Sequence, residues 1–250
     1  MKIFTNLSNF KSTNKTFVTI GTFDGVHIGH QKVIKKLVKS AKKNKATSVL
    51  LTFFPHPRMV LQKDLDIKLI NTIEERTYLL EKLGLEILVI QEFTEDFAKL
   101  SALDFVRTIL VNALNISRLV IGYDHHFGKN REGSISFINE HFGDVLETIA
   151  IDVAKVDEVI VSSSQIKKYL SEGDITKANA MLGLPFSVSG IVVHGNQNGR
   201  KIGFPTANMA LKADNKFIPQ LGVYLCRVHI EAGIFFGLTN MGYRPTLNKD

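Results

Sequence analysis

Apolar and polar residues alternate along the first 183 residues of the chain with two different periods. Short runs of apolar and β-branched residues predict strands at residues 16–20, 48–53, 85–90, 119–121 and 146–151. Between these runs, apolar residues recur every three to four positions, which predicts helices at residues 28–43, 72–83, 102–114 and 164–172. Because strands and helices alternate, we expect a parallel sheet with helices on both of its faces.

Two of the predicted helix starts carry an additional signal. Thr72 is followed three residues later by Glu75, and Ser101 is followed three residues later by Asp104. A hydroxyl residue with an acidic residue three positions further on is typical of a capping box, in which the two side chains satisfy free amides of the first turn. We therefore expect capped helix starts at both positions.

The pattern changes after residue 183. Short β-rich runs at residues 186–193, 223–229 and 234–238 are separated by glycines and prolines, and no helical period remains. This pattern of short β-rich runs predicts an antiparallel β-barrel or sandwich. We expect two domains, residues 1–183 and residues 184–250, and because the second ends without a closing strand we expect its barrel to be incomplete.

The segment from Gly21 to His30, Gly-Thr-Phe-Asp-Gly-Val-His-Ile-Gly-His, joins the strand at 16–20 to the helix at 28–43. Such a turn falls at the carboxyl end of a parallel strand, where ligands bind in open α/β sheets. A helix start offers unpaired amides and the positive end of a dipole, which favour phosphate. Gly29 lets a nucleotide approach the backbone, and His27 and His30 can donate hydrogen bonds to a phosphate that gains charge. The segment predicts a nucleotide site that acts on phosphorus.

Two histidines three residues apart are a weak signal by themselves, because such pairs are common on helix surfaces. The signal is specific here because a strand, a glycine-rich turn and His-x-Gly-His occur together. The sequence contains neither a Walker A loop nor a Gly-x-Gly-x-x-Gly fingerprint, which are the more widespread nucleotide-binding motifs.

Bulk properties narrow the class of protein. The mean hydropathy is +0.06, no apolar run approaches the ~20 residues that span a bilayer, and the first residues lack the features of a signal or transit peptide. The single cysteine, Cys226, excludes an internal disulfide. We expect a cytoplasmic protein without a membrane partner.

The net charge of the chain is +7, and seven lysines lie close together on and just after the helix at 28–43. Its lysines are Lys32, Lys35, Lys36, Lys39, Lys42, Lys43 and Lys45. Their spacing leaves the apolar stripe of the helix intact, so we expect them to form a solvated outer face. Aromatic residues are not interleaved with them, and we therefore expect no nucleic-acid partner.

Several segments together resemble the bacterial bifunctional riboflavin kinase/FMN adenylyltransferase, or FAD synthetase, family. Residues 21–30 are similar to its nucleotidyltransferase signature. Further similarity lies at residues 52–57 (Thr-Phe-Phe-Pro-His-Pro), 122–128 (Gly-Tyr-Asp-His-His-Phe-Gly), 162–167 (Ser-Ser-Ser-Gln-Ile-Lys), 199–208 (Gly-Arg-Lys-Ile-Gly-Phe-Pro-Thr-Ala-Asn) and 240–246 (Asn-Met-Gly-Tyr-Arg-Pro-Thr). These segments occur in the family's order and cover essentially the whole chain.

The resemblance implies a Rossmann-like nucleotidyltransferase domain over residues 1–183, followed by the first part of a riboflavin kinase domain over residues 184–250. It implies adenylyl transfer from ATP to FMN, giving FAD and pyrophosphate, in a family that also phosphorylates riboflavin. The partners are then small nucleotides and flavins: ATP as co-substrate, riboflavin, FMN and FAD as substrates or products, and Mg²⁺ as the cofactor.

The resemblance also implies roles for individual residues. His27 and His30 are the candidate catalytic residues. The candidate ATP-binding residues are Gly21, Phe23, Asp24, Gly25, Gly29, Ser162, Ser163, Ser164 and Lys167. On the flavin side we expect Pro55, His56 and Asp124. In the kinase domain, the candidate nucleotide loop contains Gly199, Gly203 and Pro205, and the candidate Mg²⁺ ligands are Thr206 and Asn208.

Two departures from the family pattern change these expectations. Lys167 stands where the family has arginine, and lysine lacks the planar fork of a guanidinium, so we expect weaker or differently tuned adenylyl transfer rather than its loss. The family's kinase domain draws a catalytic glutamate from beyond the Arg-Pro-Thr segment, and this sequence has no counterpart of it. We therefore expect adenylyl transfer to be retained better than phosphorylation. Two alternatives are another His-x-Gly-His nucleotidyltransferase and a non-catalytic flavin-binding module.

Overall fold

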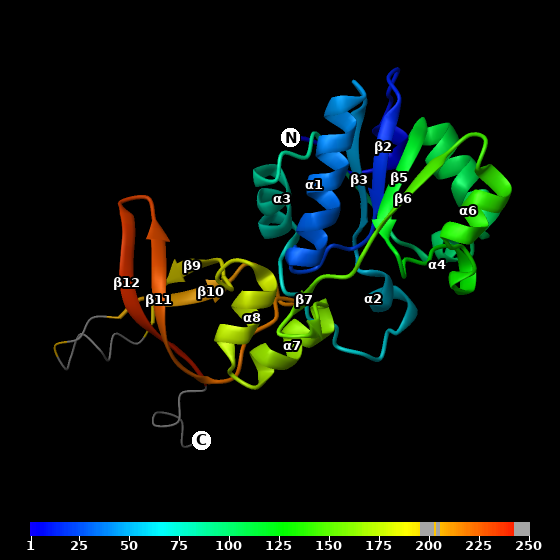
Figure 1. The fold of residues 1–250 in the computed structure, drawn as a ribbon. Coiled ribbons are helices and arrows are strands. Elements are labelled where there is room, and N and C mark those ends of the chain that lie inside the picture. The colour runs from blue at the N-terminus through cyan, green and yellow to red at the C-terminus, as the bar shows by residue number, and fades with distance from the viewer. Residues whose placement is uncertain (196–202, 204–205, 243–250) are drawn as a thin grey trace.

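A parallel sheet of six strands forms the centre of the N-terminal region (Figure 1). The structure is a computed structural model that describes residues 1–195, 203 and 206–242. The strands are ordered β1-β4-β3-β2-β5-β6, and every neighbouring pair runs parallel. Their bounds are β1 Lys2–Phe4, β2 Thr16–Ile20, β3 Thr47–Phe53, β4 Ile87–Gln91, β5 Ile116–Gly122 and β6 Glu147–Ile151. The predicted parallel sheet is confirmed, with β1 as an additional edge strand.

Helices cover both faces of this sheet (Figure 1). On one face α1 (Ile28–Lys43) and α3 (Ile73–Lys82) pack against side chains such as Phe17 and Leu50. On the other face the π-helix η2 (Phe105–Ala113) and α6 (Ile135–Phe142) pack against side chains such as Val18 and Val49. Adjacent strand residues thus face opposite layers, as the pleat requires. The other helices are η1 Leu7–Asn9, α2 Pro57–Leu61, α4 Glu95–Ala98, α5 Ala102–Asp104, η3 Lys129–Arg131, α7 Ser163–Ser171 and α8 Ile175–Leu182.

The two expected helix caps differ in detail. At the start of α3, Thr72 Oγ1 accepts from the amide of Glu75 at 3.2 Å and Glu75 Oε2 accepts from the amide of Thr72 at 3.1 Å, which is a full capping box. At α5, Ser101 Oγ accepts from the amide of Asp104, but the Asp104 carboxylate accepts from the Ser101 hydroxyl instead of its amide. The aspartate side chain is one methylene shorter than glutamate, and only half of the capping box forms there.

The exposed lysine face of α1 agrees with the sequence. All seven lysines between Lys32 and Lys45 are exposed. The buried stripe of the helix contains Val33, Ile34 and Leu37.

The region after residue 184 contains antiparallel strands, as expected. One pair joins β9 (Gly190–Val193) to β10 (Asn208–Leu211), and a second joins β11 (Gly222–Ile230) to β12 (Gly233–Met241). A further short hairpin, β7 (Lys155–Val156) with β8 (Val159–Ile160), precedes α7. Large apolar side chains of the β11–β12 hairpin are exposed, with Phe236 at 79% and Leu238 at 77%. The strands within the described residues therefore form separate pairs and do not close a barrel.

A buried lysine ties this C-terminal region to α3. Lys216 is 3% exposed, and its Nζ donates to the carbonyl of Ile70 at 2.5 Å and to Glu75 Oε2 at 2.6 Å. The backbone on either side of Lys216 bonds to Leu69 in both directions, at 2.7 Å each. Phe217 also packs in the core cluster that contains Ile70 and residues of α7 and α8. Residues on both sides of position 183 thus share one core.

Loss of the Lys216 ammonium is expected to destabilise the fold strongly. In a Lys216→Ala protein the carboxylate of Glu75 stays buried without its cation, and removing one partner of a buried pair costs about 3–5 kcal/mol. Urea unfolding measures this change in the free energy of unfolding. Lys68→Ala is the matched control, because Lys68 forms an exposed pair with Asp66 nearby and its loss is expected to cost less than about 1 kcal/mol. If the free energy of unfolding fell by the same small amount in both variants, Lys216 would not be the stabilising partner of a buried ion pair.

Candidate active site

The loop of residues 21–30 leaves β2, one of the two central strands of the sheet. β2, whose five residues are all buried, pairs with β3 on one side and β5 on the other. The chain order of the strands reverses direction at this position, and ligands of open α/β sheets bind at such a point, beyond the carboxyl ends of the strands. The loop runs directly into α1.

The loop has an unusual backbone. Phe23 and Val26 have φ angles of 50° and 41°, in the left-handed region that non-glycine residues rarely adopt. Both side chains are buried, at 4% and 1% exposure, and this packing holds the conformation in place. Gly25 has a φ of 86°, and a Cβ added to it would lie 3.0 Å from a methyl group of Ile70. The loop therefore has little freedom to rearrange.

Asp24 anchors the loop to two distant segments. Its Oδ1 accepts from the amides of Ile70 at 2.7 Å and Asn71 at 3.3 Å. Its Oδ2 lies 2.8 Å from Lys167 Nζ in an ion pair, and its backbone carbonyl accepts from Ser163 Oγ at 2.8 Å. Asp24 itself is 2% exposed. The segment before α3 and the first two turns of α7 are thereby fixed to the turn that follows β2.

His27 and His30 lie together at the start of α1. His27 is the N-cap residue, and its Nδ1 accepts from the amide of His30 at 3.3 Å. The two rings stack with 3.6 Å between their centroids, and His30 also packs on Phe23 at 4.6 Å. A Cβ added to Gly29 would lie 3.2 Å from the His27 ring. Glycine at this position therefore makes room for the imidazole, and its role in the approach of a nucleotide stays a prediction.

Both imidazoles are uncharged at neutral pH. Burial lowers the pKa of His27 to about 4, and the carboxylate of Asp24 opposes part of this shift. Burial also lowers the pKa of His30 well below its usual value, and the neighbouring His27 and Arg76 lower it further. Because His27 Nδ1 accepts a hydrogen bond, the proton of the neutral ring is on Nε2. His27 therefore presents an uncharged N–H donor.

The predicted serines lie at the start of α7. The hydrogen bond from Ser163 Oγ to the carbonyl of Asp24 holds this end of the helix next to the loop. Ser162 is the N-cap residue, and its Oγ accepts from the amide of Gln165 at 3.2 Å. Ser164 is exposed. Lys167, which the resemblance assigns to the triphosphate, contacts Asp24 in this structure. Its contact with a phosphate stays a prediction.

The residues expected on the flavin side are divided between two places. His56 follows Pro55 in the turn after β3 and caps α2 by accepting from the amide of Arg58 at 3.1 Å. Burial lowers the pKa of His56 to about 4, and the charge of Asp24 opposes part of this shift. At the end of β3, Thr52 Oγ1 donates to the carbonyl of Thr22 at 3.4 Å, so the turn begins beside the loop. Asp124 is exposed in the loop after β5, where its charge acts on the neighbouring His125.

Arg76 is a residue of this site that the sequence reasoning missed. It lies in the first turns of α3, is 1% exposed, and its Nε and Nη2 have no hydrogen-bond partner in the described part of the chain. Its charge acts on the pKa of both His30 and His56. The sequence pattern could have predicted this burial. Position 76 falls on the apolar stripe of the helix, three residues after Ile73 and four before Leu80, and a charged residue there is expected to be buried.

Comparison with known proteins gives the family. The FAD synthetase family model matches residues 9–168, and the riboflavin kinase family model matches residues 182–250. The bifunctional riboflavin kinase/FMN adenylyltransferase of Bacillus subtilis is 36% identical over 93% of this chain and 73% of that protein. The protein of the same name from Buchnera aphidicola subsp. Schizaphis graminum is 38% identical over 98% of this chain and 80% of that protein. The chain belongs to the bifunctional riboflavin kinase/FMN adenylyltransferase family.

A solved structure supports the fold of this family member. A crystal structure from Streptococcus pneumoniae, described as a macrolide-efflux protein, matches with a TM-score of 0.88 at 30% identity, over 98% of this chain and 80% of that chain. The expected fold class, a Rossmann-like sheet followed by antiparallel strands, is confirmed. Among the described residues, no helix has the length and apolar character needed to span a membrane.

The residues expected in the kinase domain are partly visible. Gly199 and Pro205 lie outside the described residues. Gly203 has a φ of 81°, and a Cβ added there would meet nothing within 4 Å. Thr206 is exposed just before β10, which begins at Asn208. A hydroxyl and an amide oxygen are the hard donors that Mg²⁺ takes, so the two side chains fit this cation in kind.

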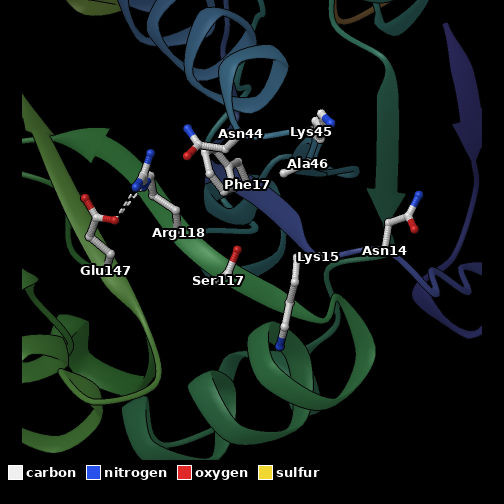
Figure 2. A pocket seen from close by; sticks show the side chains of 9 residues that line it. All are labelled: Asn14, Lys15, Phe17, Asn44, Lys45, Ala46, Ser117, Arg118 and Glu147. Carbon is white, nitrogen blue, oxygen red and sulfur yellow. Dashed lines mark hydrogen bonds and ion pairs between the residues drawn. The ribbon is translucent and has the colours of Figure 1, made fainter.

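A cavity of about 440 Å³ lies at the opposite end of the sheet (Figure 2). It is lined by Asn14, Lys15, Phe17, Asn44, Lys45, Ala46, Ser117, Arg118 and Glu147. Figure 2 shows the ion pair of Arg118 with Glu147, and Arg118 also donates to Ser40 Oγ at 2.8 Å. We exclude this cavity from the site because it lies at the amino ends of the strands and its arginine is already paired.

The burial of His27 predicts a pH-dependent stability. The pKa of His27 is about 4 in the folded protein and about 6.5 in the unfolded chain, so its contribution is complete above pH 6.5 and is lost as the pH falls towards 4. We expect this residue alone to remove about 3 kcal/mol of the free energy of unfolding between pH 7 and pH 4. Urea unfolding across this range measures the change.

His27→Asn is the control, because asparagine is also a good N-cap residue and does not titrate in this range. The variant is expected to show a flatter pH dependence than the unmodified protein. An NMR titration in which the His27 ring protonates near pH 6.5 would contradict the assignment.

Proposed function

We propose that this protein transfers the adenylyl group of ATP to FMN, forming FAD and pyrophosphate. The observation that carries the proposal is the pair of uncharged, stacked imidazoles at the start of α1, at the point of the sheet where ligands bind. Membership of a family whose members are named FMN adenylyltransferases supplies the two substrates.

The reaction needs little acid–base chemistry. The phosphate monoester of FMN has a second pKa near 6 and is largely dianionic at pH 7. One of its oxygens attacks the α-phosphorus of ATP, a new P–O bond forms, and the bond to the bridging oxygen breaks with its electron pair leaving on pyrophosphate. No proton has to be removed from the nucleophile. The protein has to align the reactants and stabilise charge on the α-phosphoryl oxygens.

The start of α1 can supply that stabilisation. In the proposal, the Nε2–H of His27 and the ring of His30 donate hydrogen bonds to the α-phosphoryl oxygens. The free amides of Ile28 and Gly29 and the dipole of the 16-residue helix add to this field. A neutral donor attracts the ground state of ATP less than an imidazolium would, so more of its hydrogen-bond energy is realised in the transition state.

The remaining predicted residues have supporting roles in the proposal. Ser162, Ser163 and Ser164 face the β- and γ-phosphates at the start of α7, and Gly21, Phe23 and Gly25 shape the loop. Lys167 joins them by sharing its ammonium between Asp24 and a phosphate oxygen. Pro55 and His56 border the flavin, and Asp124 does so from the loop after β5.

Phosphorylation of riboflavin is a second candidate activity, favoured by the match of residues 182–250 to the riboflavin kinase family model. Thr206 and Asn208 would hold Mg²⁺ there. The cation neutralises phosphate charge when it is bound. The ribityl hydroxyl, unlike a phosphate, has to lose a proton, so this reaction also needs a positioned base.

Removal of either imidazole is expected to slow FAD formation. In His27→Asn and His30→Ala we expect kcat to fall about 10²–10³-fold, because each change removes a donor to the transition state. The assay supplies ATP, Mg²⁺ and FMN and measures FAD by chromatography, so that kinase activity is not required. His141→Ala is the control, since His141 is an exposed histidine of α6, and normal turnover is expected.

Three other outcomes would contradict the proposed mechanism or identify a different function. Full turnover in both His27→Asn and His30→Ala would remove the imidazoles from the mechanism. Adenylyl transfer to another phosphate acceptor but not to FMN would identify a different nucleotidyltransferase. Binding of FMN in a calorimeter without any FAD formation would identify a flavin-binding module.

A further inference from the structure

We propose that Arg76 binds the phosphate chain of the nucleotide, and that its guanidinium has no anionic partner until the nucleotide arrives. This inference rests on the proposed function, because it takes ATP as the ligand of the site. It adds a cation from α3, an element to which neither the motifs nor the resemblance assigned a role.

The first support is the lack of partners for a buried cation. Arg76 is 1% exposed, and its Nε and Nη2 have no hydrogen-bond partner among the described residues. Buried polar groups are almost always hydrogen-bonded, and an unpaired buried charge costs several kcal/mol. Within the same residues, no carboxylate oxygen lies within 4.0 Å of its guanidinium. An anionic ligand that pairs with the guanidinium would offset this cost.

The second support is the balance of charge around Arg76. The carboxylate whose charge acts on Arg76, Asp24, already pairs with Lys167 at 2.8 Å, and that of Glu75, the preceding residue in the chain, pairs with Lys216 at 2.6 Å. The imidazoles beside them are neutral. Each of these two carboxylates thus has a lysine partner, and Arg76 has no carboxylate partner of its own among the described residues. An anionic ligand restores the balance.

The third support is position. The charge of Arg76 acts on His30 at the start of α1 and on His56 in the turn after β3, so the guanidinium lies near both. The segment just before α3 is also bonded to the loop through Asp24, so the start of α3, which contains Arg76, is held beside the turn that leads into α1. Arginine suits this task because its planar fork donates two parallel hydrogen bonds to a phosphate. Lys167, which pairs with Asp24, has no such fork.

Arg76→Met tests the proposal, because methionine is unbranched, fills much of the same space and carries no charge. We expect the KM for ATP to rise at least tenfold. We also expect the melting temperature without ligand to stay the same or rise, since an unpaired buried charge has been removed. Inorganic pyrophosphate should raise the melting temperature of the unmodified protein but not that of Arg76→Met.

Arg118→Met is the matched control. Arg118 is paired with Glu147 at the opposite end of the sheet, so the KM for ATP and the pyrophosphate effect should not change. Arg76→Lys keeps the charge without the fork and is expected to give a smaller rise in KM. If Arg76→Met does not fold, Arg76→Lys decides: a raised KM supports the proposal and an unchanged KM overturns it.

An Arg76→Met protein that melts at a lower temperature yet keeps the normal KM and pyrophosphate effect would overturn the inference and make Arg76 a structural residue. This result is distinguishable from failure of the proposed function. If the unmodified protein makes no FAD, the proposed function fails, while the pyrophosphate measurement still decides whether Arg76 binds a phosphate chain.

Discussion

The carboxylate of Asp24 is the interaction on which the rest of the site depends. It joins the turn after β2 to the segment before α3 through two amide hydrogen bonds and to α7 through Lys167. These segments lie far apart in the sequence, and Ile70 packs in the same core cluster as Ile166 and Leu170 of α7. Because the turn also contains two non-glycine residues with positive φ angles, it needs such anchoring to keep its shape. The shape in turn fixes where α1 begins and how His27 and His30 stack.

The electrostatic character of the site follows from this anchoring. Tight packing removes water from the two imidazoles, and burial keeps them neutral. In the proposed mechanism, the positive charge that an anionic substrate needs comes instead from the helix dipole of α1 and from cations on neighbouring elements. We propose neutral hydrogen-bond donors at the reacting phosphorus and cations further along the phosphate chain, an arrangement that suits a reaction whose nucleophile arrives already charged.

Local patterns in the sequence predicted most of the fold. The bounds of β2 and α1 agree with the predicted residues 16–20 and 28–43. Both elements show a clear hydrophobic pattern, and a glycine-rich turn separates them. The edge strand β1 was missed because three residues are too few to show alternation. The helix predicted at residues 102–114 exists as α5 and η2, and periodicity alone cannot distinguish α from π hydrogen bonding. The site was predictable where chemistry is local, as in the His-x-Gly-His turn. The pairs Asp24–Lys167 and Glu75–Lys216 were not, since residues 143 and 141 positions apart meet only through the tertiary fold.

The most direct test of this account is the turnover of Asp24→Asn with FMN, ATP and Mg²⁺. The asparagine can keep one carbonyl oxygen for the amides of Ile70 and Asn71 but loses the ion pair with Lys167. The account predicts that kcat falls at least about tenfold while the protein stays folded, because α7 is no longer held to the turn that positions the imidazoles. An Asp24→Asn protein with unchanged kcat would show that the anchoring carboxylate is not needed, and would contradict the central claim.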